Sequence, residues 1–400
     1  MHPPGADTVL VRHGEIGTKS EQVRRKMEGC LRDNLGALLS DRGLDAPVER
    51  RRTRLFVHTD EATVEAATDA ATDAFGVVSA SPAVRVDPTL GAIRDALAET
   101  ARECYAGGSF AVRARRAGEP DEHPFTSEDI QETGGAAVWE AAAGEGLDPE
   151  VDLDDPDLAL YVECRPKEAF VFVEKRPGPG GLPVGTQEPL VALVSGGIDS
   201  PVAAWEAMRR GCPVYPLYID LGEYGGTDHR LRAGATVAGL GPYAPNLDLR
   251  LRVAPGGEAV DRLVAETDDL RMLVFRRFMY RVAAAVAADL GAVGVVSGEA
   301  VGQKSSQTSA NLRVTSAVTD LPVHRPLLAA DKSEITERAR EVGTFEEATI
   351  PVGCNTIAPD LPETNASLAA VRAAEPDDME RLAREAARRV QAVDPDAPTG

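Results

Sequence analysis

The spacing of apolar residues predicts a small α+β unit at the start of the chain. Residues 8–12 and 54–59 each read as a β-strand. Between them, residues 21–39 carry apolar side chains three or four positions apart, which places these side chains on one face of a helix. Together these elements predict a first domain over residues 1–60.

A second α+β unit is expected over residues 61–174. Its helices are predicted at residues 61–75 and 90–105, and its strands at 109–114, 159–164 and 170–174. The segment Pro177–Pro183 is rich in proline and glycine, which extend neither a helix nor a sheet, so residues 175–189 are interpreted as a linker.

After residue 190 the pattern changes to alternating strands and helices, which is typical of a parallel α/β sheet. Residues 190–194 form a continuous apolar run, as expected for a strand that is buried on both faces. Further strands are predicted at 213–219 and 292–296, and helices at 202–209, 268–290 and 333–342. We expect this domain to cover residues 190–370, and a charged amphipathic helix near 376–390 to lie within a C-terminal segment, 371–400.

The charge of the chain indicates an unusual environment. There are 64 acidic against 43 basic residues, for a formal net charge of −21. Very few of the bases are lysine. Acidic, lysine-poor surfaces stay hydrated in concentrated salt, where repulsion between like charges is screened. We therefore interpret the composition as adaptation to a salt-rich cytoplasm.

Other features of the sequence also favour a cytoplasmic protein with no membrane partner. No apolar run approaches the ~20 residues that a helix needs to cross a bilayer. The N-terminus lacks the charged and apolar regions of a signal peptide. The five cysteines form no CxxC pair and no metal-ligand spacing, so in a reducing compartment they are expected to be free thiols.

Basic residues cluster in the first 120 residues of this otherwise acidic chain. Arginine side chains match the geometry of phosphate oxygens, so the clusters favour a polyanion as partner. The plainer alternative is a set of solvated helix and strand edges. The candidate residues are Arg24, Arg25, Lys26, Arg51, Arg113, Arg115 and Arg116.

The strongest chemical signal is the string Ser195-Gly196-Gly197-Ile198-Asp199-Ser200, directly after the predicted strand at 190–194. Two glycines let the backbone turn tightly, so that successive amide groups point into one concavity at the positive end of the next helix. Such a concavity suits phosphates, and Asp199 is suited to hold Mg²⁺ against them. The string is not the GxxxxGK[ST] loop, and the alternative is an ordinary strand-to-helix connection.

This string resembles the pyrophosphate-binding loop of the N-type ATP pyrophosphatases. In that family the loop holds the pyrophosphate end of ATP while a substrate oxygen attacks the α-phosphate. Further matches, in order along residues 8–358, narrow the resemblance to the tRNA 4-thiouridine synthetase family. They are Val9–Ile16, Phe110–Arg116, Phe125–Ser127, Val151–Leu153, Leu160–Glu163, Arg276–Arg281, Ser297–Gln303, Ser306–Thr308, Arg325–Leu327 and Asp331–Lys332.

The resemblance implies a fold and a set of site residues. The expected fold is multidomain α+β and α/β, with a ferredoxin-like N-terminal domain, a THUMP RNA-binding domain and a parallel-sheet PP-loop domain. Asp199 and Cys354 are the expected catalytic residues. Cys354 lies in the segment 349–355, which resembles the active-site cysteine loop of the family, and its thiolate would carry a persulfide sulfur. The expected ATP-binding residues are Leu193, Val194, Ser195, Gly196, Gly197, Asp199, Ser200, Tyr218, Ile219, Arg276, Gly298, Gln307 and Lys332.

The implied reaction is the thiolation of uridine 8 in tRNA by a sulfurtransferase of a halophilic archaeon. ATP would adenylate O4 of the uridine, and sulfur from Cys354 would replace it. The implied partners are tRNA, which the basic clusters would bind, a persulfide donor such as a cysteine desulfurase, and a second copy of the chain in a homodimer. Cys164 and Cys212 are candidate resolving thiols.

Three alternatives stay open at this point. The chain could be a PP-loop adenylating ligase or amidotransferase that acts on another substrate, although two RNA-reading domains would then have no use. It could be a tRNA-binding protein without catalysis, which the intact loop disfavours. It could also carry sulfur for thiamine-thiazole synthesis. The rhodanese domain and the paired-cysteine motif of some family members have no match in this sequence.

Overall fold

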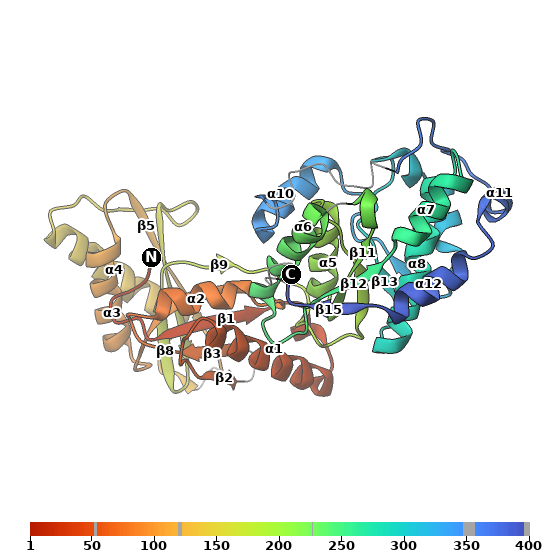
Figure 1. Ribbon diagram of the computed structural model, residues 1–400. Coiled ribbons are helices and arrows are strands. Elements are labelled where there is room, and N and C mark those ends of the chain that lie inside the picture. The colour runs from red at the N-terminus through yellow and green to blue at the C-terminus, as the bar shows by residue number, and fades with distance from the viewer. Residues whose placement is uncertain (52–53, 119–121, 226, 347–356, 396–400) are drawn as a thin grey trace. The chain divides into compact units, whose positions relative to one another are not determined.

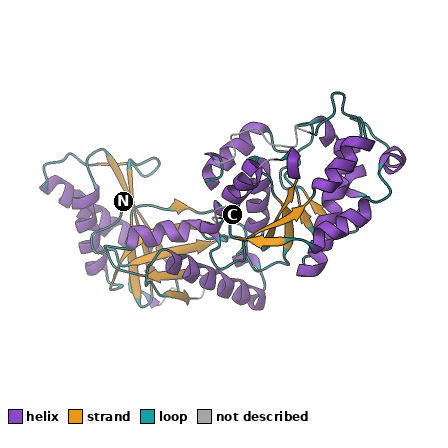
Figure 2. Ribbon diagram, in the orientation of Figure 1, coloured by secondary structure: helices purple, strands orange, loops and turns teal. Residues whose placement is uncertain are grey.

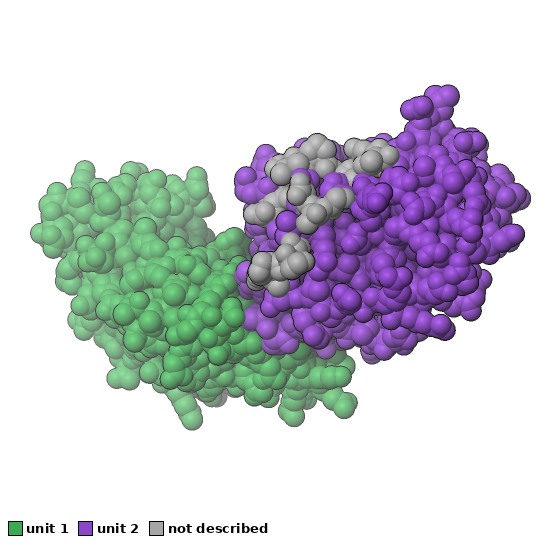
Figure 3. Space-filling view, in the orientation of Figure 1, with its two compact units in different colours: residues 1–183 green, residues 184–400 purple. Residues whose placement is uncertain are grey.

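A computed structural model describes residues 1–51, 54–118, 122–225, 227–346 and 357–395. The chain forms two compact units, Met1–Pro183 and Val184–Gly400, which Figure 3 distinguishes by colour. The division between them falls within the segment 175–189 that was interpreted as a linker. No helix in the described part of the chain is long and apolar enough to cross a bilayer.

The first unit begins with a core that two helices build on one face of a sheet. Strand β1 (Thr8–His13) pairs antiparallel with β3 (Arg54–His58) on one side and with β4 (Val77–Val86) on the other, and β2 (Val48–Arg51) extends the sheet beyond β3. Helices α1 (Glu21–Asp41) and α2 (Val64–Asp73) contribute Leu31, Leu35, Ala67 and Ala71 to the core. The helix predicted at 61–75 corresponds to α2 and packs in the same core as α1.

The rest of the first unit continues the same sheet. Its elements are α3 (Leu90–Cys104), β5 (Ser109–Arg116), α4 (Ser127–Gly144), β6 (Glu150–Val151), β7 (Leu158–Arg165), β8 (Glu168–Phe172) and β9 (Arg176–Pro177). The main strand order is β2-β3-β1-β4-β8-β7-β5-β6, and β9 pairs with β4 outside this path. Because β4 pairs with β1 and with β8, it joins the two parts into one sheet.

The second unit is a parallel sheet with one antiparallel edge strand. The strand order is β14 (Val323–His324), β13 (Val295–Val296), β10 (Leu190–Leu193), β11 (Val214–Asp220), β12 (Leu251–Pro255), β15 (Gln391–Val393), and only β15 runs antiparallel to its neighbour. The chain leaves β10 toward β11 and later returns to its other side as β13. Strand β10 is thus the point at which the strand order reverses, and ligands bind beyond the carboxyl ends of strands at such a point.

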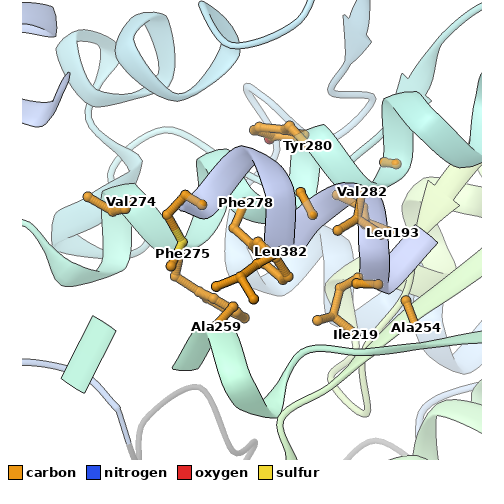
Figure 4. Close-up of a cluster of buried hydrophobic side chains, with 14 of the residues drawn as sticks. Leu193, Ile219, Ala254, Ala259, Val274, Phe275, Phe278, Tyr280, Val282 and Leu382 are labelled. Carbon is orange, nitrogen blue, oxygen red and sulfur yellow. The ribbon is translucent and has the colours of Figure 1, made fainter. Parts of the chain in front are cut away.

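Helices cover both faces of this sheet (Figures 1 and 2). The helices are α5 (Asp199–Arg209), α6 (Thr227–Ala238), α7 (Gly257–Glu266), α8 (Arg271–Leu290), α9 (Ser309–Ser316), α10 (Lys332–Val342), α11 (Leu368–Ala374) and α12 (Met379–Arg388). Figure 4 shows how Phe275 and Phe278 of α8 pack with Leu382 of α12 and with Leu193 and Ile219 of the strands. The C-terminal helix and the edge strand β15 therefore belong to the body of the second unit.

Candidate active site

The glycine loop lies between β10 and α5 and is closed by its two serines. The backbone N–H of Ser195 donates to Oγ of Ser200 at 2.8 Å, and the Ser200 hydroxyl lies 3.3 Å from the carbonyl oxygen of Ser195. The two hydroxyl oxygens are 3.2 Å apart. These bonds hold a tight turn at the start of α5, where the helix dipole favours an anion.

Glycine is required at two positions around this turn. A Cβ atom on Gly196 would lie 2.9 Å from Cβ of Arg232, and one on Gly298 would lie 2.7 Å from the carbonyl carbon of Asp199. Gly298 follows β13, the strand beside β10, so the turn packs directly against the backbone beyond the neighbouring strand. A larger residue at either position would displace the turn.

A cavity of about 400 Å³ opens beside the turn. Most of the residues that the sequence assigned to ATP lie on its surface: Leu193, Val194, Ser195, Gly197, Asp199, Ser200, Arg276, Gly298 and Gln307. The residues that sequence reasoning did not assign include Ser297, Glu299, Lys304, Ser305, Ser306, Ala358 and Pro362. The cavity therefore lies at the reversal point of the sheet, where the topology places a ligand site.

One wall of the cavity is apolar and comes from helix α8. Met272, Phe275 and Met279 line it, at spacings of three and four residues that put them on one helical face. An apolar wall next to a polar loop suits a ligand with a flat ring and a phosphate chain. The sequence contains this spacing, but it does not distinguish a ligand wall from ordinary core packing.

A buried carboxylate holds the arginine of the cavity in place. Glu299 is 2% exposed and forms an ion pair with Arg276. It also accepts hydrogen bonds from Nε of Arg325 at 2.8 Å and from the hydroxyl of Tyr280 at 2.5 Å. The side-chain amide of Gln307 is oriented so that its nitrogen donates to the carbonyl oxygen of Ala300. In this orientation the amide oxygen of Gln307 accepts a hydrogen bond from Arg276 at 3.2 Å. Arg276 is thus fixed by two partners at the edge of the cavity.

The charges around Glu299 explain its ionisation. Burial alone would raise the pKa of this carboxyl group, but Arg276 and Arg325 together with the Tyr280 hydroxyl outweigh that effect and lower it. The same carboxylate and burial raise the pKa of Tyr280. Glu299 therefore carries a negative charge at neutral pH, which balances the arginines beside the cavity.

Asp199 and Lys332 meet at the outer side of the loop. Nζ of Lys332 lies 2.8 Å from Oδ1 of Asp199, and Lys332 is the first residue of α10. Asp331 caps this helix by accepting from the backbone of Ser333 and Glu334. No group of three or more His, Cys, Asp and Glu residues in the described ranges could hold a metal by itself. Asp199 therefore suits Mg²⁺ only if phosphates complete the coordination.

Two residues expected to bind ATP, Tyr218 and Ile219, lie on β11, the strand that pairs with β10. Tyr218 and Ile219 are each 5% exposed on β11, and neither is among the described residues that line the cavity. Ile219 packs in the core of the unit. Cys354 lies outside the described residues, so its assignment stays a prediction.

The candidate resolving thiols are poorly suited to that role. Cys164 is fully buried in the first unit, and burial raises its pKa to about 11. Cys212 is half-buried, and burial raises its pKa as well. A thiol with a raised pKa is rarely ionised at neutral pH, and the thiolate is the reactive form.

The basic clusters of the first unit divide into exposed cations and structural ones. Lys26, Arg113 and Arg115 are exposed, although Arg113 also donates to the carbonyl oxygen of Leu153 at 3.1 Å, and exposed Arg25 pairs with Glu21 on its own helix. The other three are engaged within the unit: Arg24 with Glu28, Arg51 with Glu49 and Glu168, and Arg116 with the carbonyl oxygen of Phe125.

Sequence reasoning missed a second group of cations on the sheet of the first unit. The guanidinium of Arg12 lies 4.8 Å from the ring centre of Phe172, and Nζ of exposed Lys175 lies 3.8 Å from that of Tyr161. Burial lowers the pKa of Lys175, and the charge of Arg12 lowers it further. Cations held close together beside aromatic rings favour the binding of an anion whose own ring can stack on those side chains. These residues come from strands that are far apart in the sequence, so no local pattern indicates that they are neighbours in the fold.

Comparisons with known proteins agree with this geometry. Residues 185–379 match the family described as thiamine biosynthesis protein (ThiI), residues 8–81 match the ThiI ferredoxin-like domain, and residues 88–174 match the THUMP domain. The expected fold class is confirmed.

Full-length relatives are similar to the chain over nearly its whole length. A probable tRNA sulfurtransferase of Halobacterium salinarum is 59% identical, with 96% of each chain covered. One of Methanosarcina acetivorans is 39% identical over 90% of this chain and 87% of its own. Among solved structures, a 4-thiouridine synthetase–RNA complex with bound ATP has a TM-score of 0.84 at 28% identity and covers 96% of this chain and 98% of that one.

Proposed function

The chain belongs to the ThiI family of tRNA sulfurtransferases, and on that premise we propose that it makes 4-thiouridine at position 8 of tRNA in an ATP-dependent reaction. The observation that carries the proposal is the glycine loop at the reversal point of the sheet, beside a cavity with an apolar wall and a fixed arginine. The matched RNA-binding THUMP domain supports tRNA as the substrate.

The first step is adenylation. O4 of the uridine forms a bond to the α-phosphorus of ATP, and the bond from that phosphorus to the bridging oxygen breaks, which releases pyrophosphate. Negative charge develops on the phosphates during this step. It is stabilised by the amide groups of the loop, the two serine hydroxyls and Arg276. Magnesium held between Asp199 and the phosphates would add positive charge to the leaving group.

The second step replaces oxygen with sulfur. The terminal sulfur of a persulfide on Cys354 bonds to C4 of the uridine, and AMP leaves with the former O4. A second thiol then attacks the Cys354 sulfur, which leaves 4-thiouridine on the tRNA and a disulfide on Cys354. External thiol reduces that disulfide. The persulfide comes from a donor of the cysteine desulfurase class, and the enzyme works in the cytoplasm as a homodimer.

A second role is favoured by the description of the matched family as a thiamine biosynthesis protein. The same Cys354 persulfide would then serve thiazole synthesis. Nucleoside analysis separates the two roles, because only tRNA thiolation predicts that deletion of the gene removes 4-thiouridine from cellular tRNA.

The role of Cys354 is tested with Cys354→Ala. We expect this variant to form no 4-thiouridine on purified tRNA while it still releases pyrophosphate, because the phosphates and the cysteine act in separate steps. Cys30→Ala is the control, since it removes a half-buried thiol that has no assigned role in the reaction. Thiolation by Cys354→Ala at the wild-type rate would remove this residue from the mechanism.

A further inference from the structure

A second cavity, of about 500 Å³, lies on the opposite face of helix α8 from the ATP cavity. Arg276 lines the first cavity, whereas Arg277 and Arg281 line the second. Successive helical residues are rotated by about 100°, so these side chains leave the helix in different directions. The end of α9 and helices α11 and α12 complete the second cavity, and Figure 1 shows α12 beside α8.

Positive charge exceeds negative charge around this cavity. Its charged residues are Arg277, Arg281, Arg372, Arg384, Glu375 and Glu380. Such a surplus is notable in a chain with a net charge of −21. Exposed Arg372 has no ion-pair partner within the ranges that the structure describes, and Arg384 pairs with Glu380 at 3.3 Å on the rim.

The floor of the cavity is a buried arginine whose hydrogen bonds are incomplete. Arg277 is 2% exposed and donates to the carbonyl oxygen of Val314 at 3.0 Å and to Glu375 at 3.2 Å. Its Nε has no hydrogen-bond partner among the described residues. Burial lowers the pKa of Arg277, and Glu375 opposes this while Arg281 and Arg372 add to it. Glu375 also pairs with Arg281, so one carboxylate serves two arginines, and an anion in the cavity would balance the remaining positive charge.

We propose that this cavity binds a backbone phosphate of the tRNA whose uridine enters the ATP cavity. The inference rests on the proposed function, because it takes the substrate from there. Guanidinium groups match phosphate oxygens, and the cavity has room for a phosphate with its ribose. The two cavities are separated by one helix, about 10 Å across. A phosphate held behind α8 therefore positions the RNA chain relative to the adenylation site.

The test uses the full-length protein and two rim variants, Arg372→Gln and Arg384→Gln, which alter exposed side chains. The matched control is Arg381→Gln, an exposed arginine of α12 that does not line the cavity. tRNA affinity is measured by fluorescence anisotropy over a series of potassium chloride concentrations. Each rim variant is expected to weaken binding about tenfold and to lower the slope of log affinity against log salt by about 0.9.

The outcomes separate the inference from the proposed function. Rim variants that bind tRNA with the wild-type affinity and slope would overturn the inference, while thiolation by the wild-type protein would leave the proposed function intact. Calorimetry with inorganic phosphate is the second arm. Phosphate binding that Arg372→Gln abolishes, together with unchanged tRNA affinity, would show a site for free phosphate and would equally overturn the RNA assignment.

Discussion

At the scale of single residues, Glu299 connects the chemistry of the site to its stability. Its buried carboxylate pairs with Arg276 and accepts hydrogen bonds from Arg325 and from the Tyr280 hydroxyl. Breaking a buried ion pair from one side leaves a charge without its partner, which costs about 3 kcal/mol or more. Both carboxylate oxygens of Glu299 are occupied by these three partners, so neither is free to exchange a proton with the substrate. Its role is to position Arg276.

The substitution Glu299→Gln tests this role. We expect the KM for ATP to rise severalfold and the free energy of unfolding to fall by about 3 kcal/mol at neutral pH. Glu337→Gln is the control, since it changes an exposed carboxylate of α10. An unchanged KM for ATP would show that Arg276 does not depend on Glu299. Urea denaturation and steady-state kinetics provide both measurements.

The same residue gives an expected pH dependence. The folded-state pKa of Glu299 lies below its ordinary value of 4.5. Its contribution to stability is therefore present above pH 4.5 and is lost as the pH falls through the lower, folded-state pKa. The stability difference between the wild-type protein and Glu299→Gln should accordingly shrink as the pH falls below 4.5.

At the scale of elements, the cap of helix α10 affects the active site because the first residue of this helix contacts the loop. Asp331 accepts from two backbone amides, and Lys332 reaches Asp199. Loss of a helix cap typically costs about 1 kcal/mol. Fraying of the first turn would also release Lys332 from the loop.

The substitution Asp331→Ala is therefore expected to raise the KM for ATP as well as to lower stability by about 1 kcal/mol. Thr126→Ala removes the corresponding capping box of α4 in the other unit and should cost similar stability. It should leave the KM for ATP unchanged. If both variants show the same KM, the contact between Lys332 and Asp199 does not contribute to ATP binding.

Elements with a clear local pattern in the sequence were predictable, and elements without one were not. The helix at 268–290 and its end at Gly291 were predictable, since this glycine adopts the left-handed conformation that ends helices. Helix α4 was missed because Gly134 and Gly135 interrupt its pattern. A Cβ atom on Gly134 would lie 2.4 Å from Cδ1 of Leu97 on α3, so a larger residue there would force the Leu97 side chain to shift. Strand β15 has only three residues, and it forms by pairing antiparallel with β12 at the edge of the sheet.

The site was predictable in part for the same reason. The glycine loop carries its chemistry in six consecutive residues, so the sequence alone located it. The apolar wall of α8 and the cations over Tyr161 are formed by tertiary packing. Tyr218 and Ile219 were expected at the ATP site, but the described cavity is formed by β10 and the segment after β13.

At the scale of the whole molecule, the net charge of −21 sets the conditions for stability. Salt at molar concentrations shortens the range of charge repulsion to about 3 Å. We expect the free energy of unfolding, measured with urea, to increase between about 0.2 M and 2 M potassium chloride. A stability that stays constant or falls over this range would contradict the halophilic interpretation.

The most direct test of the account measures pyrophosphate released by the purified protein with magnesium, ATP and tRNA at high salt. The glycine loop and its cavity predict release that depends on tRNA, with one pyrophosphate for each 4-thiouridine formed when a persulfide donor is added. No pyrophosphate above the tRNA-free background, from protein shown to be folded, would contradict the central claim that this loop binds ATP to activate a tRNA base.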